Sequence, residues 1–295
     1  MKKVSVIGSG TMGNGIAHCF AQYGFDVNLV DISLENLNKA KNTIQKNLDR
    51  MIQKNKITNT DKNDILKRIE FNTKLDQAVK NSDLVIEAAT ESKKIKLDIF
   101  QKLDEICDSK TILASNTSSI SIGEIGRSTN REEKVIGMHF MNPVPIMKLV
   151  EVIKSNNTSQ QTVSQIMELS RQLNKKPVLV NDSPGFVANR ILLPMINEAI
   201  QTLQEGVSGV KEIDTVMILG MSHPMGPLQL ADFIGLDVCL SILEVLHEGL
   251  KDRKYSPTSL LKTLVKNNEL GVKSKKGFYD YSQGIKNKTV SDRFK

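Results

Sequence analysis

Cysteine is scarce in this 295-residue sequence, and long apolar runs are missing altogether. The three cysteines, Cys19, Cys107 and Cys239, are odd in number and show neither CxxC nor metal-ligand spacing, which argues against a disulfide framework and against a zinc site. No stretch approaches the roughly 18–20 apolar residues that a membrane-spanning helix needs. The N-terminal MKKVSVIGSGTMG reaches glycine too early for the apolar core of a signal peptide. We therefore expect a cytoplasmic protein with reduced, buried cysteines, no bound metal and no membrane contact.

Aromatic residues are also few, at 4% of the chain. The formal net charge of +7 suggests an anionic partner, but the basic residues are spread along the chain and aromatic residues rarely lie among them. Nucleic acid is therefore not the expected partner, and a salt-dependent gel shift would be needed to support it. A phosphorylated small molecule would be attracted by the same positive charge.

The order of the apolar segments predicts two domains. In residues 1–183, strand-like runs such as VSVIGSG, FDVNLVDIS, LVIEAAT, TILASNT and VIGMHF alternate with helical patterns, one of them at 34–56. This alternation predicts an α/β Rossmann-type domain with a doubly wound parallel sheet. After the break at Pro184 and Gly185, residues 184–295 show long apolar-periodic helices, including 187–205 and 227–250, and predict an all-α C-terminal domain. The tail from Lys273 onward suggests a surface strand or loop with a frayed end.

The first strand leads into a glycine-rich loop. Gly8, Gly10 and Gly13 form a GxGxxG pattern after this strand and at the start of a helix, with Thr11 and Met12 inside the pattern. Such glycines allow a tight turn and close approach to a pyrophosphate at the helix N-terminus. Asp31 ends the second strand, where a carboxylate accepts hydrogen bonds from the ribose hydroxyls of NAD but repels the 2′-phosphate of NADP. The sequence therefore predicts an NAD site, with a helix cap or an exposed strand end as the alternative role of Asp31.

A second group of polar residues lies between Ser115 and Ile153. Asn116, Ser118, His139, Asn142 and Glu151 occupy expected strand ends and turns, where open α/β sheets bind ligands. If VIGMHF and KLVEVI pair antiparallel about Pro145, residues 139 and 151 oppose each other with Cβ atoms roughly 4.5–5.5 Å apart. Glu151 could then orient the imidazole of His139 and favour its protonated form, leaving the other ring nitrogen to accept a substrate proton. A purely structural hydrogen bond is the alternative.

These segments together are similar to a known family. In order and spacing, GSGTMGNGIA, EAATE, ASNTSS, GMHFMNPVPIMKLVEVI, NDSPGFVANR, HPMGPLQLADFIGLD and KKGFYDY resemble the 3-hydroxyacyl-CoA dehydrogenase family over nearly the entire chain. Within the family, the sequence is most similar to the bacterial stand-alone 3-hydroxybutyryl-CoA dehydrogenases. The resemblance implies NAD-dependent interconversion of short-chain (S)-3-hydroxyacyl-CoA and 3-ketoacyl-CoA in fatty-acid or butyrate metabolism.

The resemblance also implies roles for individual residues. His139 corresponds to the catalytic base, Glu151 to its orienting partner, and Ser118 and Asn189 to residues that hold the substrate oxygens. Further matches place Glu91, Lys96, Asn116, Asn142 and Lys273 near the cofactor, although ordinary surface charge is the alternative for several of them. Lys54 corresponds to a lysine that meets the phosphates of coenzyme A, whereas Asn47 stands where the family pattern has serine. His18, His223 and His247 lack a comparable partner and are interpreted as structural.

Two other functional classes remain open from the residues. A relative acting on a free hydroxy acid would keep the same His–Glu pair, and coenzyme A dependence separates the two activities. A non-catalytic NAD-binding protein would keep only the fold, because fold alone does not determine activity. The apolar surface of the helices at 187–205 and 227–250 predicts a homodimer formed through the helical domain, and the family resemblance points the same way.

Overall fold

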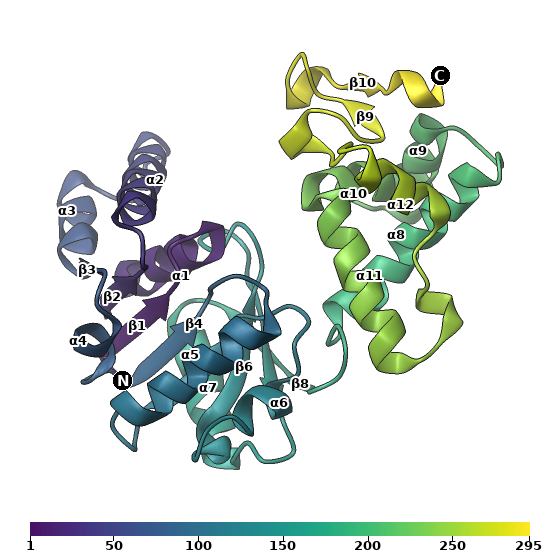
Figure 1. Ribbon diagram of the computed structural model, residues 1–295. Helices are drawn as coiled ribbons and strands as arrows, with labels where there is room; N and C mark the ends of the chain where they lie inside the picture. Colours follow the sequence, from purple (N-terminus) through teal and green to yellow (C-terminus); the bar gives the residue numbers. More distant parts are fainter. The chain divides into compact units, whose positions relative to one another are not determined.

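The computed structural model describes residues 1–295, which divide into two units, 1–183 and 184–295 (Figure 1). An eight-stranded sheet forms the centre of the first unit, with the strand order β3-β2-β1-β4-β5-β6-β7-β8. Strands β1 to β6 run parallel, β7 pairs antiparallel with β6, and β8 pairs parallel with β7. The strands are β1 (Lys3–Ile7), β2 (Asp26–Val30), β3 (Ile69–Asn72), β4 (Leu84–Glu87), β5 (Ile112–Ser115), β6 (Val135–Phe140), β7 (Leu149–Lys154) and β8 (Lys176–Asn181).

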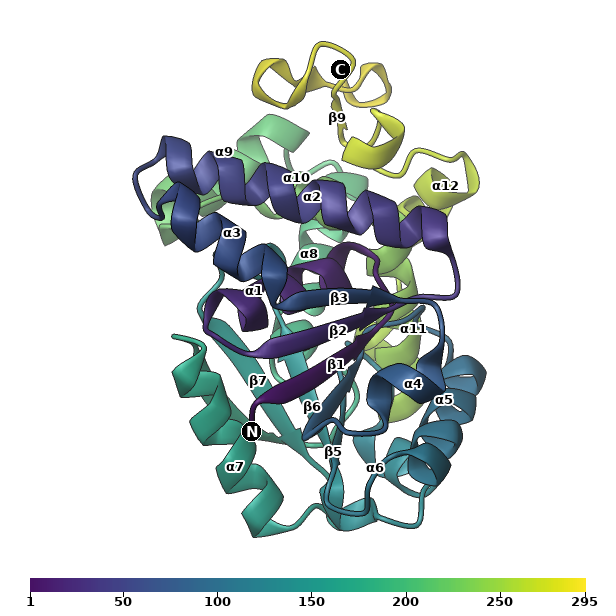
Figure 2. The same cartoon turned by 90° about the vertical axis from the view of Figure 1, so that its left-hand side faces the viewer.

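Helices cover both faces of this sheet, which confirms the predicted doubly wound α/β domain. Figure 2 shows α1 and α7 against one face and α4, α5 and α6 against the other. The inner strands β4, β5 and β6 are buried along their whole length because both of their faces are covered. The helices are α1 (Thr11–Gln22), α2 (Leu34–Gln53), α3 (Asn59–Lys67), α4 (Leu75–Val79), α5 (Lys93–Ile106), α6 (Ile122–Gly126) and α7 (Gln160–Gln172), with a 3-10 turn η1 (Glu132–Lys134).

One part of this unit differs from the sequence prediction. The helix expected at 34–56 ends at Gln53, and α3 and β3 follow it before the chain reaches β4. Helix α3 begins with a capping box, in which Thr58 and Asp61 each accept a hydrogen bond from the other's backbone N–H. Only one of the nine residues of α3, Ile65, is buried, so its apolar periodicity is weak.

The second unit is mostly helical. Its helices are α8 (Ala188–Gln204), α9 (Val210–Met221), α10 (Pro227–Ile234), α11 (Leu236–Leu250) and α12 (Ser259–Lys266), with 3-10 turns η2 (Arg253–Tyr255), η3 (Val272–Ser274), η4 (Ile285–Asn287) and η5 (Asp292–Phe294). The prediction of one helix at 227–250 is wrong, because Gly235 adopts a φ of +101° and separates α10 from α11. A small antiparallel pair, β9 (Tyr279–Asp280) and β10 (Thr289–Val290), lies in the tail, where the sequence predicts a surface strand or loop.

The C-terminal tail is anchored rather than frayed. Arg293 pairs with Glu269, and the ring of Phe294 lies 5.6 Å from that of the fully buried Phe278. Tail residues also bond to a buried carboxylate, because the backbone N–H groups of Phe278 and Tyr279 donate to Asp232. These contacts fix a segment whose composition alone suggested a mobile end.

The cysteines agree with the sequence prediction. Cys19, Cys107 and Cys239 are all buried and unpaired. Burial raises the pKa of Cys19 and of Cys107 to about 11 and that of Cys239 to about 12. None of the helices combines the length and the apolar character needed to cross a membrane.

Candidate active site

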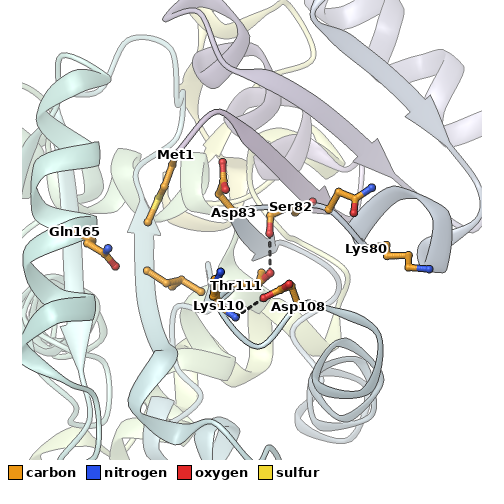
Figure 3. A pocket seen from close by; sticks show the side chains of 10 residues that line it. Met1, Lys80, Ser82, Asp83, Asp108, Lys110, Thr111 and Gln165 are labelled. Carbon is orange, nitrogen blue, oxygen red and sulfur yellow. Dashed lines mark hydrogen bonds between the residues drawn. The ribbon is translucent and has the colours of Figure 1, made fainter.

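The predicted site residues of the first unit gather at the carboxyl ends of the parallel strands. Gly8 follows β1, Asp31 follows β2, and Asn116 follows β5. A polar pocket at the opposite edge, by contrast, is lined by residues that precede the strands, among them Met1, Asp83 and Thr111 (Figure 3). Because open α/β sheets bind their ligands at the carboxyl ends, the candidate site lies at the edge away from this pocket.

The glycine loop has the geometry of a pyrophosphate cradle. Gly8 has a φ of +97°, and a Cβ atom there would lie 2.6 Å from the carbonyl oxygen of Ala88. A Cβ atom at Gly13 would lie 1.8 Å from the carbonyl oxygen of Gly8, so neither position tolerates a side chain. Gly10 has no atom within 4 Å of such a Cβ, and its open side therefore admits a ligand close to the backbone. Gly10 caps α1 without a side chain, which leaves the N–H groups of the first turn, including those of Thr11 and Met12, for an anion.

Asp31 is held in place by its neighbours. The backbone N–H and the hydroxyl of Ser9 donate to its Oδ2 at 2.9 and 2.7 Å, and the N–H of Ser33 donates to its Oδ1 at 3.0 Å. Partial burial opposes ionisation of Asp31, but the hydrogen bonds from Ser33, Ser9 and Asn36 outweigh it and lower the pKa of the carboxyl group. The residue therefore presents a fixed negative charge at the end of β2, which fits a ribose and disfavours a 2′-phosphate.

His139 and Glu151 lie opposite each other in the register that the sequence predicts. Strands β6 and β7 pair antiparallel with His139 facing Glu151. The His139 Nδ1 lies 2.7 Å from the Glu151 Oε2, and both side chains are almost fully buried. An ionised carboxylate accepts from an Nδ1–H, so this contact assigns the lone pair of the neutral ring to Nε2.

The two asparagines near His139 occupy different environments. Asn116 Oδ1 accepts a hydrogen bond of 2.9 Å from the backbone N–H of Phe140, so its side chain links the end of β5 to the residue after His139. Asn142 is exposed in the turn between β6 and β7.

Lys175 holds the turn between β6 and β7 from a distant part of the chain, because its Nζ donates to the carbonyl oxygens of Val144 and Met147 at 2.5 and 2.7 Å.

Glu91, Lys96 and Ser118 form one connected cluster. Lys96 is buried and lies 3.2 Å from the Oε2 of Glu91. The Oε1 of Glu91 accepts from the backbone N–H groups of Ser118 and Ser119 and from the hydroxyl of Thr117. Burial opposes ionisation of Glu91, but the charge of Lys96 and these hydrogen bonds outweigh it and lower the pKa of the carboxyl group.

Two further residues of the site, Ser9 and Glu87, were not predicted from the sequence. Ser9 was visible only as a variable position of the glycine motif, although its place before Gly10 puts its hydroxyl beside the end of β2. Glu87 is fully buried and bonds to Lys96 at 2.7 Å. The sequence contains one signal for Glu87, since it is the acidic residue that ends the apolar run LVIE. A carboxylate buried at the end of such a strand requires a specific partner.

Four predicted residues lie apart from this group along the chain. Asn47 and Lys54 lie seven residues apart at the C-terminal end of α2, which places them near the same side of that helix. Asn189 is buried in the first turn of α8 in the second unit. Lys273 is exposed in the same unit and pairs with Asp237.

The glycine cradle, Asp31 and the doubly wound sheet define the class: a dinucleotide-binding protein of the Rossmann type. Comparison with known proteins narrows this class. The family profile described as "3-hydroxyacyl-CoA dehydrogenase, NAD binding domain" matches residues 3–183, and the profile of the C-terminal domain of the same family matches residues 185–281. The chain therefore belongs to the 3-hydroxyacyl-CoA dehydrogenase family. It is an oxidoreductase, and NAD is its cofactor.

Individual relatives cover almost the whole chain. A probable 3-hydroxybutyryl-CoA dehydrogenase of Bacillus subtilis is 52% identical over 96% of this chain and 98% of its own length. The 3-hydroxybutyryl-CoA dehydrogenase of Clostridioides difficile is 50% identical over 95% of this chain and 100% of its own length. The crystal structure of (S)-3-hydroxybutyryl-CoA dehydrogenase from Ralstonia eutropha matches with a TM-score of 0.92 and 48% identity, covering 96% of this chain and 99% of that one.

Proposed function

We propose that this enzyme interconverts (S)-3-hydroxybutyryl-CoA and acetoacetyl-CoA, with His139 and Glu151 as its proton-transfer pair. The observation that carries the proposal is the buried contact of 2.7 Å between the His139 Nδ1 and Glu151. This contact fixes the tautomer of His139, so that the other ring nitrogen, Nε2, can accept a proton as a general base. The names of the relatives support the choice of substrate.

His139 handles the proton of the reacting hydroxyl. In the oxidation, its Nε2 accepts the proton of the C3 hydroxyl, and Glu151 stabilises the imidazolium that forms. In the reduction, the same nitrogen returns the proton to the C3 oxygen. NAD, when bound, supplies the chemistry of hydride transfer. General-base assistance of this kind contributes about 10²–10⁴-fold in rate.

The other predicted residues position the reactants. Gly8, Gly10 and Gly13, with Thr11 and Met12, bind the pyrophosphate, and Asp31 binds the adenosine ribose. Ser118 and Asn189 donate hydrogen bonds to the substrate oxygens and polarise the carbonyl. The remaining residues, Glu91, Lys96, Asn116, Asn142 and Lys273, line the cofactor site, while Lys54 and Asn47 meet coenzyme A.

The substrate proposal is tested by the oxidation of NADH in the presence of three sets of acceptors. Acetoacetyl-CoA, free acetoacetate and longer 3-ketoacyl-CoAs are compared by kcat/KM. We expect acetoacetyl-CoA to be preferred, with free acetoacetate turned over poorly because it lacks the coenzyme A contacts. Preference for the free acid would indicate a hydroxy-acid dehydrogenase, and preference for longer chains would correct the assigned chain length.

A further inference from the structure

The carboxylate of Glu87 is fully buried at the end of β4, where an unpaired charge would be strongly unfavourable. Three donors satisfy it. The backbone N–H of Ala89 and the Nζ of Lys96 both donate to its Oε1 at 2.7 Å, and the hydroxyl of Ser115 donates to its Oε2 at 2.7 Å. Glu87 therefore joins the ends of two neighbouring strands, β4 and β5, to helix α5.

Lys96 carries this arrangement outward to Glu91. Its ammonium group lies 2.7 Å from Glu87 and 3.2 Å from Glu91, and its side chain is only 1% exposed. One cation thus lies between two carboxylates, and the charges of the three side chains sum to −1. Glu87 is the closer and more deeply buried partner, so it attracts the ammonium group more strongly than Glu91 does.

Glu91 in turn holds the loop that contains Ser118. Its Oε1 accepts from the backbone N–H of Ser118 at 3.0 Å and from the backbone N–H and hydroxyl of Ser119 at 3.2 and 2.8 Å. A second connection runs through Ser115, whose hydroxyl accepts from the backbone N–H of Thr117 at 3.2 Å. Both connections from Glu87 end on residues 117–119.

We propose that Glu87 is a positioning residue, which sets the orientation of Ser118 through Lys96 and Glu91 on one side and through Ser115 on the other. Because its side chain is fully buried, it acts through these neighbours. The proposal rests on the function proposed above, in which Ser118 contacts the substrate. Loss of the Glu87 charge should therefore reduce turnover by displacing Ser118.

The first test compares Glu87→Gln with a matched control at the opposite edge of the sheet. Thr111 is 1% exposed, and its hydroxyl donates to the carbonyl oxygen of Ser82 at 2.7 Å (Figure 3). Thr111→Val removes a buried hydrogen bond near β5 without touching the Glu87 network. For Glu87→Gln we expect kcat/KM for acetoacetyl-CoA to fall about 10- to 100-fold, as small displacements of positioning groups do. Thr111→Val should lower the melting temperature but leave kcat/KM within about twofold of the unmodified value.

The second test separates positioning from a general loss of stability. Glu87→Gln is combined with Ser118→Ala and assayed at saturating NADH, so that weaker cofactor binding does not contribute. The double variant should then match Ser118→Ala alone within about twofold, because no hydroxyl remains to be positioned. Additive losses would overturn the proposal, as would an unchanged Glu87→Gln enzyme or an equal loss in Thr111→Val. If Glu87→Gln does not fold, Ser115→Ala replaces it in the same cycle, with a smaller loss of kcat/KM that again disappears in the Ser118→Ala background.

An activity-independent measurement keeps the two proposals distinguishable. An unmodified enzyme that does not turn over acetoacetyl-CoA would contradict the proposed function only. In that case NADH binding, followed by its fluorescence, tests the positioning of Lys96 and Glu91. A dissociation constant about tenfold higher in Glu87→Gln and unchanged in Thr111→Val would support the role of Glu87. Equal affinities in the two variants would overturn it.

Discussion

Asp31 keeps its negative charge because Ser9 and Ser33 donate hydrogen bonds to it. We expect the unmodified enzyme to prefer NADH over NADPH, since a 2′-phosphate would meet this charge with no cation in Ile32 or Ser33 to compensate. Asp31→Ala should lower kcat/KM for NADH about 10- to 100-fold, which is the loss expected for hydrogen bonds to a charged group. The ratio of kcat/KM with NADH to that with NADPH should therefore become smaller. Steady-state kinetics with both cofactors provide the measurement. A higher kcat/KM of the unmodified enzyme with NADPH would contradict the role of Asp31.

The proton-transfer pair gives a second prediction for single residues. His139→Gln should lower kcat by about 10²–10⁴-fold with little change in NADH binding, because the imidazole handles the proton and not the adenosine half. Glu151→Gln should cause part of that loss, since an amide can still bond to the ring but no longer stabilises the imidazolium. The two losses should be non-additive, because Glu151 has nothing to orient once His139 is absent. Fully additive losses, or near-normal turnover by His139→Gln, would rule out the pair.

The most predictable site residues were those that face each other across two strands joined by a short turn. The opposition of His139 and Glu151 follows from a short turn and the two-residue period of a strand, so the sequence positions alone define it. Glu87 was not predictable in the same way. Its partners Lys96 and Ser115 lie 9 and 28 residues away. The parallel pairing of β4 with β5 brings Ser115 beside Glu87, and Lys96 reaches it from α5.

The turn between β6 and β7 depends on a lysine from a distant part of the chain. Lys175 is 7% exposed and donates to the carbonyl oxygens of Val144 and Met147. Lys175→Met keeps the length of the side chain but leaves these carbonyls without their donor, at a cost of about 1–3 kcal/mol for the buried carbonyl of Val144. We expect a melting temperature lower by several degrees and a severalfold higher KM for NADH, because Asn142 lies in the same turn.

The neighbouring lysine provides the control for this prediction. Lys176 is exposed on β8, so Lys176→Met should leave both the melting temperature and the KM for NADH nearly unchanged. Thermal unfolding followed by circular dichroism and steady-state kinetics check the pair of variants. Equal behaviour of the two would mean that Lys175 does not hold the turn.

Element boundaries were less predictable than element types. The apolar period runs through Gly235 without interruption, so sequence favoured one helix where the positive φ of this glycine divides α10 from α11. Helix α3 and strand β3 were missed for the opposite reason, since they bury few side chains and therefore show little periodicity. In both cases the local sequence pattern was not sufficient, and the bounds of the elements depend on the tertiary structure.

Stability of the second unit should depend on pH through a pair of buried carboxylates. Asp232 accepts from the backbone N–H groups of Phe278 and Tyr279 and from the hydroxyl of Tyr281, and burial still raises its pKa to about 7. Burial also raises the pKa of Asp214, which accepts from the hydroxyl of Tyr279. In the unfolded chain Asp232 titrates near its ordinary value of 3.8. Between about pH 4 and pH 7 Asp232 therefore binds more protons in the folded chain than in the unfolded one, and its contribution to the free energy of unfolding falls as the pH rises.

Asp232→Asn removes this titration. The variant should lose some stability at every pH, because an amide cannot accept from all three donors. Its unfolding free energy should nevertheless fall less with rising pH than that of the unmodified protein, by up to about 1.4 kcal/mol per pH unit inside the window. Urea unfolding of the full-length chain at several pH values measures the slope of unfolding free energy against pH for both proteins. Identical slopes would show that the pKa of Asp232 does not change on folding.

The second unit also bears on the quaternary structure. The sequence predicted exposed apolar side chains on the helices at 187–205 and 227–250. In the structure the most exposed ones of this unit's helices include three on α9, where Val216, Leu219 and Met221 are 60%, 78% and 61% exposed. Ile191 on α8 is a further exposed apolar residue, at 67%. Apolar side chains that gather on neighbouring helices are typical of an interface between subunits.

We expect a homodimer formed through this surface, with a mass by light scattering near twice the 32.8 kDa of one chain at micromolar concentration. Leu219→Asp should shift the mass toward that of a monomer, because it places a charge in the apolar contact. Ile32→Asp serves as the control, since Ile32 is an apolar residue of the first unit that is 99% exposed, and its substitution should leave the mass unchanged. A monomeric unmodified protein would contradict the dimer, and a dimer that survives Leu219→Asp would place the interface away from the centre of α9.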